Sequence, residues 1–111
     1  KAAVYESSEP AIADGHVTII RLDKTRVDPK YVADYLRVGF GAQQIERLYT
    51  GSTGLIELTP QHVSDVYIDL LKSVRGQIKA SSALREDERN AERARVDAAD
   101  ALAKARARFR S

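Results

Sequence analysis

The side chains with the most telling chemistry in this sequence are cationic and amide groups between residues 21 and 47. Arginine and lysine pair with phosphate oxygens and with the acceptor edge of guanine, and glutamine can bridge the edge of adenine. Such residues in one stretch predict contact with duplex DNA, although each of them alone is also an ordinary surface residue. The predicted contact residues are Arg21, Lys24, Arg26, Lys30, Arg37, Gln43, Gln44 and Arg47.

A glycine-rich loop follows this stretch. Gly51-Ser52-Thr53-Gly54 offers hydroxyls and backbone N–H groups that suit phosphate oxygens. The same loop can equally be a structural turn, because its glycines tolerate positive φ. If the loop contacts phosphate, Ser52 and Thr53 belong to the predicted DNA contacts.

Groups that could carry out a reaction are scarce. His16 and His62 are the only histidines, and neither has a serine, a cysteine or a second histidine at a useful spacing. The glycine-rich loop lacks the lysine of a nucleotide-binding loop. An Asp/Asn-Pro-Pro-Tyr motif, typical of adenine methyltransferases, is missing as well. The sequence therefore predicts a protein that is not an enzyme and has neither a metal site nor a cofactor of its own.

Short helices and strands are expected to position the polar groups. A capping residue followed by proline predicts helices that begin at Asp28-Pro29 and at Thr59-Pro60, the second ending near residue 64. Another helix is expected over 43–48. Runs of β-branched or alternating apolar residues predict strands over 16–22, 55–58 and 66–70, with an edge strand over 2–5. The predicted fold class is α+β, with a small mixed α/β domain over residues 1–71.

Residues 72–111 form the second predicted domain, one long helix. Alanine, arginine and acidic residues dominate it, and it holds no proline. Apolar side chains recur at steps of three or four, the spacing of a thin coiled-coil seam. The partner would be a second copy of the chain or an equivalent helix in missing sequence. The predicted helix interface comprises Val74, Ile78, Leu84, Ala91, Ala98, Leu102 and Phe109.

The composition of the chain bears on its charge, its redox environment and its location in the cell. Its net charge of +2 conceals a C-terminal end that carries only basic charges. The absence of cysteine excludes disulfides and fits a reducing compartment. No apolar run approaches the roughly 20 residues of a membrane span, and the N-terminus lacks a signal-peptide core. We expect a soluble, cytoplasmic protein with no membrane contact.

The order of the motifs resembles one family. They are Asp28-Pro29, Tyr31 and Tyr35, Phe40-Gly41, Gln44-Ile45, the loop Thr50-Gly51-Ser52-Thr53-Gly54, Leu58-Thr59-Pro60, Val66-Tyr67-Ile68-Asp69-Leu70 and Gln77-Ile78. In this order they resemble the second half of a target recognition domain in the specificity subunit of type I restriction-modification systems. The long spacer helix of such subunits would follow.

The resemblance implies a function in DNA methylation and restriction. The recognition domain would read the DNA sequence, while paired long helices would set the distance between two such domains. Methyltransferase (modification) subunits and restriction subunits would dock around it. S-adenosylmethionine would bind to the partner methyltransferase and not to this chain.

Two departures from the family pattern leave alternatives open. The family's prolines before the long helix are replaced here by Ile68-Asp69-Leu70-Leu71, and the part before residue 72 is about half a recognition domain. We therefore expect a fragment, from a specificity subunit or from a specificity region fused to an N6-adenine DNA methyltransferase. A purely structural coiled-coil assembly module is the alternative from a different class. The target DNA sequence, and whether restriction is served as well as modification, stay open.

Overall fold

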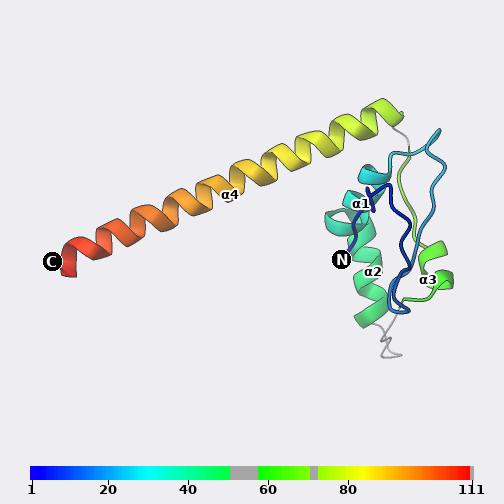
Figure 1. Ribbon diagram of the computed structural model, residues 1–111, viewed down its shortest axis with the longest axis horizontal. Helices are drawn as coiled ribbons and strands as arrows, with labels where there is room; N and C mark the ends of the chain where they lie inside the picture. The colour runs from blue at the N-terminus through cyan, green and yellow to red at the C-terminus, as the bar shows by residue number, and fades with distance from the viewer. Residues whose placement is uncertain (51–57, 71–72, 111) are drawn as a thin grey trace. The chain divides into compact units, whose positions relative to one another are not determined.

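The fold consists of helices joined by extended segments. The computed structural model describes residues 1–50, 58–70 and 73–110, and over these ranges it has four helices and no strand (Figure 1). They are α1 (Pro29–Val38), α2 (Phe40–Thr50), α3 (Pro60–Ser64) and α4 (Val74–Arg110). The predicted α+β class is therefore wrong for the described part of the chain. The chain divides into two compact units, Lys1–Ile78 and Lys79–Ser111.

The two predicted helix starts are confirmed. Asp28 caps α1, where its Oδ2 accepts a hydrogen bond from the backbone N–H of Tyr31 at 3.0 Å. Thr59 caps α3 by accepting from the N–H of His62, while the Nδ1 atom of His62 accepts from the N–H of Thr59 at 3.2 Å. This reciprocal pair is a capping box in which histidine stands where glutamate or glutamine is usual. In both helices proline occupies the first turn, where its missing N–H costs no hydrogen bond.

The predicted strands over 2–5, 16–22 and 66–70 are extended or irregular segments instead. β-propensity records how well a side chain fits a pleated, half-buried surface, and it cannot by itself supply a neighbouring strand. Side chains bond to the segment 66–70 where a strand was expected: Gln44 bonds to the backbone of Tyr67, and Tyr31 bonds to that of Asp69. Val17 and Ile19, in the predicted strand over 16–22, are 58% and 55% exposed. Residues 55–57 of the fourth predicted strand lie outside the described residues.

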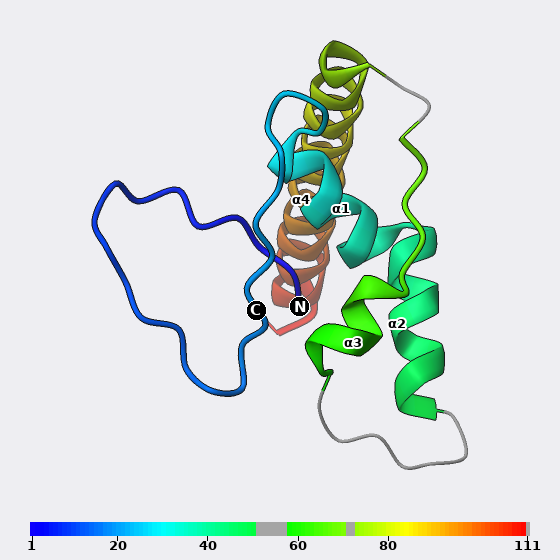
Figure 2. The same ribbon diagram turned by 90° about the vertical axis from the view of Figure 1, so that its right-hand side faces the viewer.

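A small apolar core lies around α1 and α2, which pack against each other (Figure 2). Val27 and Val32 are its buried apolar side chains among the described residues, at 7% and 3% exposure. Close approach of the two helices requires a glycine at position 41, because a Cβ atom there would lie 2.9 Å from the carbonyl oxygen of Tyr35. With so little apolar burial, polar contacts carry much of the tertiary structure.

Two glutamine side chains each make two long-range polar contacts with the backbone. The Gln44 amide on α2 donates to the carbonyl oxygen of Tyr67 and accepts from its N–H, both at 2.8 Å. Gln77, in the first turn of α4, is fully buried. Its Oε1 accepts from the N–H of Asp28 at 2.7 Å, and its Nε2 donates to the carbonyl oxygen of Arg26 at 3.4 Å. Each glutamine thereby substitutes for the backbone pairing that a neighbouring strand would give.

Gln44→Ala is expected to lower the free energy of unfolding by about 1–2 kcal/mol, because two hydrogen bonds of ordinary strength are lost. Its neighbour Gln43 is exposed, so Gln43→Ala is a matched control with an expected change within about 0.5 kcal/mol. Urea unfolding of both variants measures the difference. Equal stability of the two variants would contradict the structural role of Gln44.

Tyr31 ties α1 to the segment that precedes α4. Its hydroxyl donates to the carbonyl oxygen of Asp69 at 3.1 Å. Burial raises the pKa of Tyr31 above its ordinary 10.0, and the nearby Asp69 and Tyr35 raise it further. In the unfolded chain the phenol ionises first, so this stabilisation is complete below pH 10.0 and disappears as the pH rises through the folded-state pKa.

Urea unfolding between neutral pH and about pH 11 tests this titration. The wild-type protein is expected to lose more stability over that range than Tyr31→Phe, which has no phenol to ionise. Tyr49→Phe, at a residue that is 42% exposed, is the matched control for the loss of one tyrosine hydroxyl. The assignment is wrong if the Tyr31 variant follows the wild-type curve.

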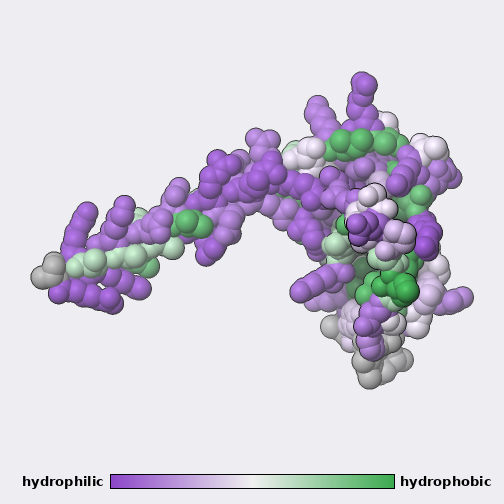
Figure 3. Space-filling view, viewed as in Figure 1, coloured by the Kyte–Doolittle hydropathy of each residue, from purple (hydrophilic) through white to green (hydrophobic). Residues whose placement is uncertain are grey.

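The long C-terminal helix is confirmed over Val74–Arg110. Its 37 residues contain one glycine and no proline, so nothing in the sequence interrupts the backbone hydrogen bonds. The side chains of residues 86–110 are all exposed in this chain. Figure 3 shows a hydrophobic strip along the C-terminal half of this otherwise hydrophilic helix.

Candidate nucleic-acid interface

An ordered turn before α1 presents the most concentrated positive charge of the Lys1–Ile78 unit. The backbone N–H groups of Arg26 and Val27 both donate to the carbonyl oxygen of Asp23 at 3.0 Å. The Asp23 side chain closes the same turn, because its Oδ1 accepts from the hydroxyl and from the N–H of Thr25, at 2.6 and 3.0 Å. These side-chain and backbone bonds from Thr25, helped by the charge of Arg26, hold the pKa of Asp23 below its ordinary value.

Three predicted DNA contacts lie on or beside this turn. Arg21, Lys24 and Arg26 are all exposed. Asp23 is the acidic residue among them, and its carboxylate is engaged by Thr25. Arg26 is also anchored through its carbonyl oxygen, which accepts from buried Gln77. The turn therefore offers three cations on a fixed backbone, and we name residues 21–26 the basic turn.

Two further predicted cations are engaged by carboxylates. The Nζ atom of Lys30 lies 3.0 Å from Oε1 of Glu6, and both side chains are at least half exposed. The guanidinium of Arg37 donates to Oδ1 of Asp34 at 3.1 Å. Asp34 is 5% exposed, so this bond compensates a buried acidic side chain. A phosphate would have to compete with Asp34 for Arg37, whereas the exposed Lys30–Glu6 pair opens at little cost.

The remaining predicted contacts lie on α2 or beyond it. Gln43 and Arg47 are exposed on α2, whereas Gln44 is held by Tyr67. Ser52 and Thr53 lie outside the described residues. Arg21, Lys24 and Arg26 thus lie together on or beside one turn. Gln44 instead bonds to the backbone of Tyr67 and has a structural role.

The predicted helix interface extends along α4. Val74 is half-buried and Ile78 is 49% exposed at the end of the first unit. In the second unit Leu84 is half-buried, and Leu102 and Phe109 are 51% and 94% exposed. Ala91 and Ala98 are exposed between them. From residue 86 onward, all the predicted interface side chains are therefore exposed in this chain.

The sequence did not point to the roles of Gln77, Asp34 and Gln44. Gln77 and Gln44 bond to residues far away in the chain, so no local sequence spacing predicts these hydrogen bonds. For Asp34 a signal existed, because Arg37 follows three residues later on a predicted helix. His62, at the third position of α3, could also have been predicted as a capping residue if the capping-box pattern is extended to include histidine.

Comparisons with known proteins give no likeness from which to transfer a function. No family model, no curated protein and no solved structure matches the chain. Within the described ranges, no group of three histidine or acidic side chains is arranged to hold a metal ion. None of the described helices has both the length and the apolar character needed to cross a membrane.

Proposed function

We propose that this protein is a DNA-binding module that carries a helical assembly arm. The observation that supports the proposal best is the basic turn, where Arg21, Lys24 and Arg26 are exposed on or directly before one hydrogen-bonded turn. Exposed arginine and lysine side chains are the groups that most often contact the phosphates of a DNA backbone. Because the turn is already ordered, binding would fix little additional backbone.

The surroundings of the basic turn favour an anionic partner. The ionised Asp23 carboxylate accepts bonds from the hydroxyl and N–H of Thr25, and the three cations around it leave residues 21–26 with a net positive charge. Lys30 in the first turn of α1 and Gln43 and Arg47 on α2 are exposed polar groups on the following elements. In the proposal the basic turn holds the phosphate backbone, and Gln43 and Arg47 are candidates for base contacts.

The resemblance to type I specificity subunits extends this proposal. In its favour, two short helices, a capped third helix and a long helix follow one another in the expected order, although the expected strands are absent from the described residues. On this extension the protein is a cytoplasmic, non-catalytic specificity component that scaffolds methyltransferase subunits, and S-adenosylmethionine binds only in those partners. Alternatively, the chain is a specificity region fused to an N6-adenine DNA methyltransferase, with the same function in DNA recognition.

A purely structural assembly module is the second candidate. The exposed apolar side chains of α4 favour it, because a helix with one apolar stripe gains most of its stability from packing. This candidate predicts self-association without DNA affinity. Sedimentation of the chain with and without duplex separates the two candidates.

Fluorescence anisotropy of a labelled duplex tests the DNA proposal. We expect binding at low salt that weakens linearly on a log–log plot as salt increases, with a slope of about −0.9 for each phosphate contacted. A slope near −3 would correspond to the basic turn alone. Absence of binding at about 50 mM salt would reject the proposal, because electrostatic attraction is strong there.

A further inference from the structure

The exposed segment before the basic turn contains one aspartate-glycine pair, Asp14-Gly15. Every residue from 5 to 17 is exposed, and Ile12 is 100% exposed. Figure 2 shows this segment as a loop that stands away from α1, α2 and α3. No other aspartate or asparagine of the chain precedes a glycine. Exposed loops of this kind are where attack on the main chain concentrates.

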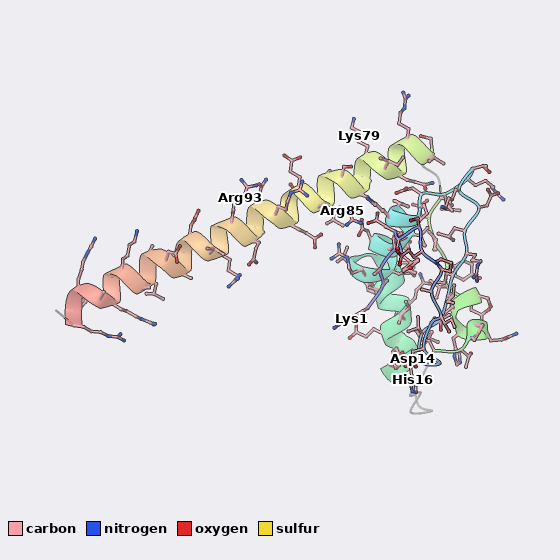
Figure 4. The ribbon with its side chains drawn as sticks, viewed as in Figure 1. Lys1, Asp14, His16, Lys79, Arg85 and Arg93 are labelled. Carbon is pink, nitrogen blue, oxygen red and sulfur yellow. The ribbon has the colours of Figure 1, made fainter. Side chains whose placement is uncertain are left out.

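A hydrogen-bonded turn folds the Asp14 carboxyl group over the backbone that follows it. Its Oδ1 accepts from the N–H of His16 at 2.9 Å, and its carbonyl oxygen accepts from the N–H of Val17 at 2.9 Å. Figure 4 labels Asp14 and His16 in this turn. The bond from His16 closes a ring of atoms that includes the nitrogen of Gly15. The carboxyl carbon Cγ of Asp14 is therefore held on the side of that nitrogen.

Gly15 leaves its nitrogen open to close approach. It has no side chain to stand between the nitrogen and the carboxyl group. A Cβ atom placed on Gly15 would have nothing within 4 Å of it apart from its chain neighbours. Neither packing nor a side chain therefore keeps Cγ of Asp14 away from the nitrogen of Gly15.

We propose that Asp14-Gly15 is a modification site, where the chain isomerises to isoaspartate without an enzyme. The nitrogen of Gly15 attacks Cγ of Asp14 and forms a five-membered succinimide. One carboxyl oxygen leaves as water, together with the amide hydrogen and one proton from solvent. Water then reopens the ring and returns both hydrogens. Addition at the α-carbonyl breaks the original peptide bond and leaves the chain linked through Cγ, whereas addition at Cγ restores aspartate.

Isomerisation removes the turn and leaves the composition unchanged. One water molecule leaves and one is added, so the mass stays the same and no oxidant, reductant or cofactor is consumed. The main chain gains the Cβ atom of Asp14. Both acceptors of the turn change, because Oδ1 becomes part of the main-chain amide and the former carbonyl oxygen becomes part of an α-carboxylate. The isoaspartyl α-carboxylate is then an exposed group that a methyltransferase specific for isoaspartate can esterify.

Digestion of the aged full chain tests the site. Trypsin cleaves after lysine and arginine, so Asp14 falls in the peptide of residues 2–21, where it is the only aspartate. After incubation of the folded protein at neutral pH, chromatography separates the isoaspartyl form of this peptide from the aspartyl form. Isoaspartyl O-methyltransferase with labelled S-adenosylmethionine then marks the isoaspartyl form.

We expect the isoaspartyl form to accumulate in peptide 2–21, and to accumulate about ten times more slowly in Gly15→Ala, whose methyl group crowds the nitrogen. That methyl group has room in the fold, so the variant should fold like the wild-type protein. The tryptic peptide of residues 96–104 is an internal control, because Asp97 and Asp100 precede alanine within α4. Absence of isoaspartate from peptide 2–21, or equal accumulation in Gly15→Ala or in peptide 96–104, overturns the proposal. The inference does not rest on DNA binding.

Discussion

Replacing Arg21, Lys24 and Arg26 together by alanine is expected to weaken duplex binding by about two to three orders of magnitude near 0.1 M salt. The basic turn loses all three of its exposed cations in this variant, while the Asp23–Thr25 bonds that shape it remain. Each phosphate contact contributes about 0.9 to the salt slope, so the slope should fall by about 2.7. Anisotropy titrations over a series of salt concentrations measure both quantities.

A matched triple variant controls for net charge. Arg75, Lys79 and Arg93 are exposed on α4, where Figure 4 labels Lys79 and Arg93. Replacing these three by alanine changes the net charge by the same amount but leaves the basic turn intact. We expect a much smaller change of slope. If the two triple variants lose affinity equally, binding follows overall charge, and the basic turn has no special role.

Gln77→Leu is expected to lower the free energy of unfolding by about 1–3 kcal/mol, which is roughly a 5- to 150-fold change in the folding constant. Leucine has a similar volume but cannot accept the N–H of Asp28, which Gln77 now binds at 2.7 Å. It also cannot donate to the carbonyl oxygen of Arg26. The N–H of Asp28 and the carbonyl oxygen of Arg26, which are part-buried, then lose their hydrogen-bond partner. The free energy lost in this way exceeds the free energy gained from burying leucine.

Lys79→Leu is the control for Gln77, since Lys79 is exposed in the following part of α4. Its effect should stay within about 0.5 kcal/mol. Gln77→Leu should also weaken DNA binding slightly, because Arg26 loses an anchor of its backbone. Full stability of the Gln77 variant in urea unfolding would show that the buried amide does not hold the start of α4 to the turn.

The helices could be predicted because their signals are local. Asp28 and Thr59 are each followed by proline, and both cap the helix that was expected. The long run without proline gives α4, and its apolar positions follow from spacing alone. Such features depend on neighbours within four residues, so one sequence is enough to find them.

The strands and the polar contacts depend on distant neighbours. Val17 and Ile19 have high β-propensity, yet neither belongs to a strand in the described residues; the N–H of Val17 donates to the carbonyl oxygen of Asp14, and both side chains are exposed. Gln44 was predicted as a base contact from its residue type, whereas its amide binds the backbone of Tyr67. Only the folded arrangement distinguishes a glutamine that can contact DNA from one that holds a neighbouring segment.

The central claim, that the basic turn contacts DNA, is tested most directly by nuclear magnetic resonance. Amide resonances of the isotopically labelled full chain are recorded while a short duplex is added. We predict that the signals of residues 21–26 and Lys30 shift most, and that those of the α3 region, residues 60–65, stay in place. Shifts that leave residues 21–26 unchanged, or no shifts at low salt, would contradict the account.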